Sequence, residues 1–235
     1  MEEKNSIHAG HRERLRERYR EAGLDHFADH EILELLLGYT ILQKDTNPIA
    51  HQLIEQFGSL RGVLEAGEEK LERVNLVGPT TAFFLAMLPD ITRRYHEQLA
   101  NPEPRLMTPE QCITFFLPRF IGRKKECILA AFLDETKRLI DYASIGQGYN
   151  NTVHLHAPTL LHEAKKRGCR YVVLGHNHFT DAIPSLEDIA VTRTARATLL
   201  TGGIGLLDHV IVCGSNATSM VESGHFQLTK PKIDD

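Results

Sequence analysis

The sequence has few cysteines, no long apolar run and no large excess of charge of either sign. Its four cysteines include no Cys-x-x-Cys pair, so the sequence signals neither a disulfide framework nor a thiolate zinc site. No apolar run approaches the ~18 residues that span a bilayer, and residues 1–20 are charged where a signal peptide would be apolar. We therefore expect a cytoplasmic protein with no membrane partner.

Charge is divided unevenly between the two parts of the chain. Residues 1–104 contain 12 Lys and Arg against 18 Asp and Glu, whereas residues 105–235 contain 15 against 13. The net charges of −6 and +2 differ from the strongly basic value of a domain that binds nucleic acid through bulk electrostatics. The composition, with 42% hydrophobic and 25% charged residues, is that of a folded globular protein.

Turn residues divide the first hundred positions into four or five predicted short helices. Apolar residues recur there at helical spacing, and glycines such as Gly58 separate the segments. The stretch 99–109 (LANPEPRLMTP) contains three prolines and no periodicity, as linkers do. We therefore predict a helical domain over 1–104 and a second domain over 105–235.

The second domain alternates between strand and helix patterns. Strands are predicted where short apolar runs lie between charges and turns, and helices where apolar residues recur every three or four positions. The expected helices cover 108–122, 158–168 and 185–200, and the expected strands cover 127–133, 139–145, 171–174 and 206–212. This mixed order predicts an α/β (α+β) sandwich.

Two histidines at the end of a predicted strand give the first sign of chemistry. His176 and His178 are two residues apart, so their imidazoles leave one face of the strand and can share a metal ion. The spacing alone is weak, because the chain contains 13 histidines and a second such pair, His154 and His156. Structural histidines are the alternative interpretation of both pairs.

The helix predicted after these histidines supplies a third group. Ser185 begins this helix, and Asp188 falls in its first turn, where the helix dipole favours a carboxylate. Two imidazoles and one carboxylate leave a fourth position for water, as in catalytic zinc sites. Ser185 and Asp188 are also explained as an N-cap and a first-turn acid, a variant of the capping box that needs no metal.

A known metalloprotease signature resembles this part of the chain. The JAMM signature of MPN domains, in the form carried by bacterial RadC proteins, is similar to His176-Asn177-His178, Pro184-Ser185, Glu187-Asp188 and Thr192. Residues 10–39 resemble the start of RadC, 75–82 a helix-hairpin-helix turn, and 207–211 a late RadC strand. The resemblance covers nearly the whole chain. It implies a three-layer, cytidine-deaminase-like domain with a mixed sheet, behind a helical domain that contacts DNA in repair proteins.

The resemblance assigns roles to five residues. His176, His178 and Asp188 would bind one zinc ion per chain, and Ser185 would help to stabilise the oxyanion. Glu126 precedes the strand 127–133 and stands where JAMM proteins place the glutamate that takes a proton from water. An exposed glutamate before a buried strand is the alternative interpretation of Glu126.

Two departures from the family pattern lie beside this predicted site. RadC proteins usually read His-Asn-His-Pro-Ser-Gly-Asp-Pro, whereas Phe179-Thr180-Asp181-Ala182 follows His178 here, and the loop before Ser185 is one residue shorter. Ala157-Pro158-Thr159 replaces the family's Pro-Arg-Glu. These differences leave open a different substrate or a scaffold that no longer catalyses.

Few residues are expected to contact DNA. Arg12, Arg16 and Arg20 share one face of a predicted helix, but glutamates alternate with them, so a solvated, ion-paired helix is the default interpretation. Gly78 lies in the helix-hairpin-helix-like turn, where Thr80 replaces the second glycine of DNA-binding versions. Phosphate contacts by these arginines and Gly78 remain an expectation.

The sequence predicts a RadC-like zinc metallohydrolase and gives no signal for its oligomeric state. It would be a JAMM-type peptidase or isopeptidase acting on a protein or peptide, with a link to DNA repair. A DNA-associated binding module or metal-dependent nuclease is the alternative, and an inactive, metal-free JAMM scaffold is the third hypothesis.

Overall fold

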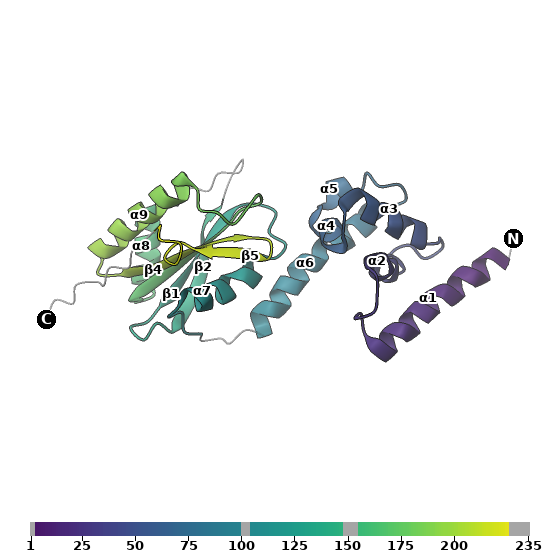
Figure 1. The fold of residues 1–235 in the computed structure, drawn as a ribbon, viewed down its shortest axis with the longest axis horizontal. Helices are drawn as coiled ribbons and strands as arrows, with labels where there is room; N and C mark the ends of the chain where they lie inside the picture. The colour runs from purple at the N-terminus through teal and green to yellow at the C-terminus, as the bar shows by residue number, and fades with distance from the viewer. Residues whose placement is uncertain (1–2, 100–103, 148–154, 226–235) are drawn as a thin grey trace. The chain divides into compact units, whose positions relative to one another are not determined.

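The computed structural model describes residues 3–99, 104–147 and 155–225. The chain forms two compact units, Met1–Ile91 and Thr92–Asp235, and each is described by itself (Figure 1). The division after Ile91 comes earlier than the boundary near residue 104 that the sequence predicts. Residues 100–103 of the predicted linker lie outside the described residues. No helix in the described ranges is long and apolar enough to cross a bilayer.

Helices build the first unit, as the sequence predicted. Up to residue 99 the described chain forms α1 (Glu3–Ala22), α2 (Asp29–Leu37), α3 (Asn47–Phe57), α4 (Leu60–Glu65), α5 (Glu68–Leu71) and α6 (Pro79–Leu99). The prediction of four or five short helices was wrong, because α1 and α6 extend over 20 and 21 residues. Pro89 lies inside α6 without ending it.

Local sequence determines where these helices begin and end. Pro48 lies in the first turn of α3, where its missing N–H costs no hydrogen bond, and Gly58 ends the helix with φ at 82°. Ser59 then caps α4 by accepting a hydrogen bond from the Gly62 N–H at 3.0 Å. Apolar side chains from α2, α3 and α6 meet in the core of this unit, among them Leu33, Leu53 and Leu85.

A five-stranded mixed sheet forms the centre of the second unit. Its strands are β1 (Cys127–Leu133), β2 (Leu139–Gln147), β3 (Tyr171–Asn177), β4 (Gly205–Cys213) and β5 (Asn216–Ser219), in the order β2-β1-β3-β4-β5. β3 and β4 are parallel, and the other neighbours are antiparallel. The four predicted strands are confirmed; β5 is an addition, because its polar sequence NATS has no apolar alternation.

Helices cover both faces of this sheet. α8 (Ala157–Lys166) and α9 (Leu186–Thr201) pack on one face, where Ile128 of β1 lies in one core with Leu160 and Leu199. α7 (Pro109–Phe116) and the 3-10 helix η1 (Leu117–Phe120) pack on the other face, where Leu129 lies in a core with Phe116. The helix, sheet and helix layers of the second unit confirm the predicted α/β sandwich (Figure 1).

Gly175 allows α7 to approach β3 closely. A Cβ atom built at this position would lie 2.3 Å from a ring carbon of Phe116, far inside van der Waals contact. Phe116 is fully buried in the core between α7 and the sheet. The residue next to His176 is therefore fixed as glycine by packing on the opposite face of the strand.

We predict that Gly175→Ala destabilises the second unit by ~1–3 kcal/mol, because the added methyl group must displace the Phe116 ring. Denaturant unfolding followed by circular dichroism would measure this loss. Gly78→Ala is the control, since nothing lies within 4 Å of its added Cβ, and its effect should stay within about 0.5 kcal/mol. Equal effects of the two substitutions would contradict the packing argument.

Candidate metal centre

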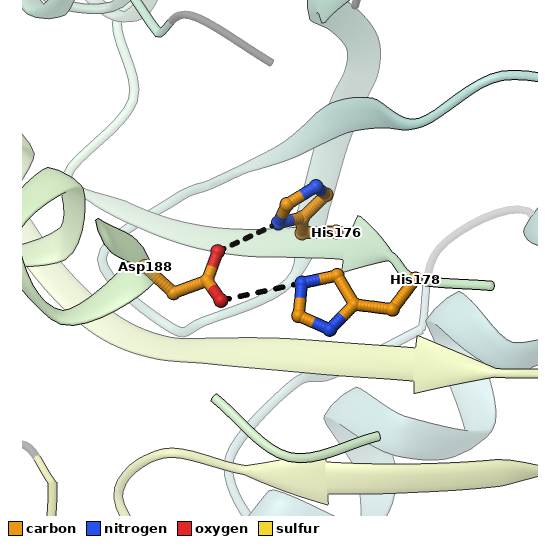
Figure 2. Close-up of side chains that lie close together, drawn as sticks. All are labelled: His176, His178 and Asp188. Atoms are coloured by element: carbon orange, nitrogen blue, oxygen red, sulfur yellow. Dashed lines mark hydrogen bonds and ion pairs between the residues drawn. The ribbon is translucent and has the colours of Figure 1, made fainter. Parts of the chain in front are cut away.

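His176, His178 and Asp188 come together at the end of β3. His176 lies in the strand, His178 follows it, and Asp188 comes from the first turn of α9 (Figure 2). Nδ1 of His176 lies 2.9 Å from Oδ1 of Asp188, and Nε2 of His178 lies 3.2 Å from Oδ2. One ligand atom of each residue lies within 4.8 Å of the others. The structure thus brings together the three residues predicted as metal ligands.

The start of α9 fixes the Asp188 carboxylate. Ser185 is the N-cap, and its Oγ accepts a hydrogen bond from the Asp188 N–H at 3.1 Å. In return, the N–H and hydroxyl of Ser185 donate to Asp188 Oδ2 at 2.8 and 2.6 Å. This reciprocal arrangement is a capping box with aspartate in the third position. The Asp188 carboxylate therefore both completes the capping box and is the candidate ligand.

The carboxylate of Asp188 is held as an anion. Burial acts to raise its pKa, but hydrogen bonds from His176, His178 and Ser185 outweigh burial and hold the pKa well below its usual range. The pKa of His178 is raised, mainly by its hydrogen bond to Asp188, against the opposing effect of burial. The negative charge of Glu126 adds to this increase. His176, His178 and Ser185 therefore surround one buried carboxylate with polar contacts.

Thr192 and His209 contact Asp188 and His176 and help to hold them in place. The Thr192 hydroxyl donates to the Asp188 carbonyl oxygen at 2.5 Å, and its oxygen lies 2.7 Å from Nδ1 of His209. Because the hydroxyl proton is used, Nδ1 of His209 is the donor in the second contact. Burial lowers the pKa of His209 to about 3, so its ring is neutral. This ring stacks against His176 with centroids 6.2 Å apart.

A bulge in β4 places His209 on this face of the sheet. Val172 pairs with Leu206, but Val173 pairs with Asp208, so Leu207 is an extra residue in β4. An extra residue reverses which side chains face each side of a strand. His209 consequently faces the helix α9, as His176 does. Thr192 and the segment 207–211 belong to the family resemblance, but no role for His209 was predicted, because a bulge cannot be read from alternation.

Glu126 and Ser185 border the same cavity as the three candidate ligands. The cavity has a volume of about 430 Å³ and is lined by Glu126, Ile128, His176, His178, Thr180, Asp181, Ile183, Pro184, Ser185, Glu187, Asp188 and Val191. Glu126 immediately precedes β1 and is half-buried. All five residues to which the sequence resemblance gave a role thus surround one cavity, and their roles remain predictions.

Comparisons with known proteins identify the family of the chain. A family model described as the RadC-like JAB domain matches residues 106–225, which is more than half of the chain. The chain belongs to the RadC family. It is 31% identical over 232 residues to a UPF0758 protein of Fusobacterium nucleatum, covering 95% of this chain and 99% of that protein. A UPF0758 protein of Burkholderia cenocepacia is 32% identical over 216 residues, covering 90% and 83%.

The loop after His178, which the family resemblance predicts to be one residue short, delivers Asp188 to the histidines. The His178 N–H donates to the Val212 carbonyl oxygen at 2.8 Å, which fixes the start of the loop. Asp181 accepts a hydrogen bond from the Ile183 N–H at 2.9 Å, which tightens its middle. The missing residue therefore does not separate α9 from the end of β3.

The second histidine pair does not take part in the site as far as the structure describes it. His156 is the N-cap of α8, and its Nδ1 lies 2.8 Å from the Thr159 hydroxyl. His154 lies outside the described residues. Cys112, Cys127 and Cys169 are buried, and burial raises the pKa of Cys112 to about 12 and that of Cys169 to about 11.

The arginines predicted to contact DNA are engaged within the helical unit. Arg12 donates to the carbonyl oxygens of Ile41 and Leu42, both at 2.8 Å, and also to that of Lys44. Arg16 and Arg20 both pair with Glu13, at 3.4 and 3.0 Å. Gly78 is exposed just before α6. DNA contact by these residues stays a prediction.

We expect Thr192→Val to lower the free energy of unfolding by ~1–3 kcal/mol, because it leaves Nδ1 of buried His209 without a partner. Thr194→Val, which removes an exposed hydroxyl bonded to the Ala190 carbonyl, is the matched control and should cost less than about 0.5 kcal/mol. Denaturation midpoints of the two variants would test this difference. A harmless Thr192→Val would show that Thr192 does not support the site.

Proposed function

We propose that this RadC family protein is a zinc-dependent hydrolase of the JAMM type that cleaves a peptide or isopeptide bond. The observation that carries the proposal is the meeting of His176, His178 and Asp188 in a cavity that also contains Glu126. The cavity lies in a unit whose four cysteines are free, which is consistent with a reducing cytoplasm.

The three side chains fit a zinc ion. Imidazole nitrogen and carboxylate oxygen are ligands that zinc prefers, and three protein ligands leave one position open, as in catalytic sites. Their ligand atoms lie within 4.8 Å of one another, whereas ligands of a tetrahedral zinc site are about 3.3 Å apart. Nε2 of His176 is buried without a hydrogen-bond partner among the described residues. The donor types and this free imidazole nitrogen therefore fit a zinc ion.

The other cavity residues have separate tasks in the proposed reaction. When bound, zinc supplies Lewis acidity, which polarises an amide carbonyl and makes a nearby water molecule more acidic. Glu126 accepts the proton of that water and then donates it to the leaving amine. The Ser185 hydroxyl, which already donates to Asp188, lies where it can turn toward the carbonyl oxygen that gains negative charge.

Among the described residues, no contact favours a DNA-associated function as a second candidate. Arg12, Arg16 and Arg20 are engaged by backbone carbonyls and by Glu13, so phosphate binding would have to compete with these contacts. The described lining of the cavity contains carboxylates, which repel a phosphate backbone. A link to DNA repair would therefore need a protein partner or substrate.

Metal content tests the proposal directly. Protein purified without added metal or chelator should contain about one equivalent of zinc by elemental analysis, because the site offers three ligands. His178→Ala and Asp188→Ala should lose the zinc, whereas His162→Ala, which removes a histidine of α8 outside the cavity, should keep it. Absence of metal, even after zinc is supplied, would overturn the hydrolase proposal.

Glu126→Gln separates metal binding from catalysis. This variant should retain zinc, because Glu126 is not among the three clustered ligands, yet cleave peptides ~10²–10⁴-fold more slowly. Mass spectrometry of a proteome-derived peptide mixture would measure cleavage, because such a mixture presents many sequences at once. Unchanged cleavage by Glu126→Gln would remove this residue from the mechanism.

A further inference from the structure

Among the described residues that line the cavity beside β3 and α9, carboxylates outnumber lysines and arginines. Four acidic side chains line it, Glu126, Asp181, Glu187 and Asp188, and none of its described lining residues is a lysine or arginine. When a divalent cation is bound, the two ligand histidines are neutral. The four carboxylates and the cation then give the described lining a net charge of −2. The cavity is therefore acidic even when its metal is present.

A buried group with unused bonding capacity also faces this acidic lining. His176 lines the cavity and is 6% exposed, and its Nε2 has no hydrogen-bond partner among the described residues. Buried polar atoms are normally paired, so an unpaired one marks a place where a ligand completes the structure. Because His176 is a proposed zinc ligand, the metal accounts for this atom, and the acidic lining surrounds the proposed metal site.

Apolar side chains border the same cavity. Ile128, Ile183, Pro184 and Val191 contribute to its lining. Ile183 is 66% exposed, and Leu186, at the first position of α9, is 87% exposed. Ile183 lines the cavity, and Leu186 lies between the lining residues Ser185 and Glu187 in the sequence. Exposed apolar side chains of this size favour a recognition surface. They favour a substrate with an apolar group close to its charged one.

We propose that the substrate is a cationic peptide segment, with a lysine or arginine and an apolar residue close to the bond that is cleaved. The basic side chain pairs with Glu187 and Asp181, which are exposed, and the apolar one packs on Ile183 and Leu186. This inference rests on the proposed hydrolase function and names the class of substrate for the same site.

Asp181 and Glu187 provide the proposed charge preference, and neither has a role in the proposed reaction. Glu187 lies in the first turn of α9 and is exposed, next to buried Asp188. Asp181 uses one oxygen to accept the Ile183 N–H. Asparagine at 181 can keep that hydrogen bond while losing the charge, and glutamine at 187 keeps the size of the side chain. Asp181→Asn/Glu187→Gln therefore removes two charges with little change in shape.

Binding of paired peptides tests the inference. A short fluorescent peptide with lysines beside an apolar residue, and its counterpart with glutamates in place of the lysines, would be titrated by anisotropy into the full chain supplied with zinc. We expect the lysine peptide to bind at least ~tenfold more tightly at low ionic strength, and Asp181→Asn/Glu187→Gln to reduce this ratio to about threefold or less.

The controls separate this inference from the proposed hydrolase function. Glu110→Gln/Glu135→Gln removes two exposed carboxylates that do not line the cavity and should leave the ratio unchanged. Equal binding of both peptides, binding of neither, or tighter binding of a single-stranded oligonucleotide would overturn the inference. Mass spectrometry of the same samples reports cleavage. Charge-selective binding without cleavage would contradict the hydrolase alone, and cleavage without charge selectivity would contradict the inference alone.

Discussion

The buried negative charge of Asp188 is the constraint on which the rest of the site depends. An isolated carboxylate costs several kcal/mol to bury, so its charge must be balanced by close partners. Here the partners are two imidazoles and the hydroxyl and N–H of Ser185. The same balance can be supplied by a divalent cation, which makes this arrangement suitable for a metal centre.

The second unit holds these partners in place through packing on both sides of its sheet. Gly175 lets Phe116 press against β3 from one face, while α9 covers the other face, where His176 lies. The extra residue Leu207 in β4 then turns His209 toward α9, where it stacks behind His176 and contacts Thr192. Packing of Phe116 and α9 against β3, and the contacts of His209 and Thr192, therefore orient the carboxylate and its imidazole partners.

Local signals in the sequence, together with the family resemblance, predicted which three residues meet at the centre of the site. The spacing of His176 and His178 at a strand end, and of Ser185 and Asp188 at a helix start, are properties of a few neighbouring residues. The structure joins the two pairs, as expected. The role of His209 could not be predicted, because it depends on the register between β3 and β4. Similarly, Arg18 of α1 pairs with Glu31 of α2, a tertiary contact that helical spacing within α1 does not predict.

The metal environment itself gives the most direct test of this account. X-ray absorption at the zinc edge, on the full chain reconstituted with one equivalent of zinc, reports the ligands independently of any substrate. Nitrogen and oxygen neighbours at about 2.0–2.1 Å, with the outer scattering of two imidazoles, are the expected result. Sulfur neighbours at about 2.3 Å, or no imidazole scattering, would contradict the assignment of His176, His178 and Asp188 as the metal centre.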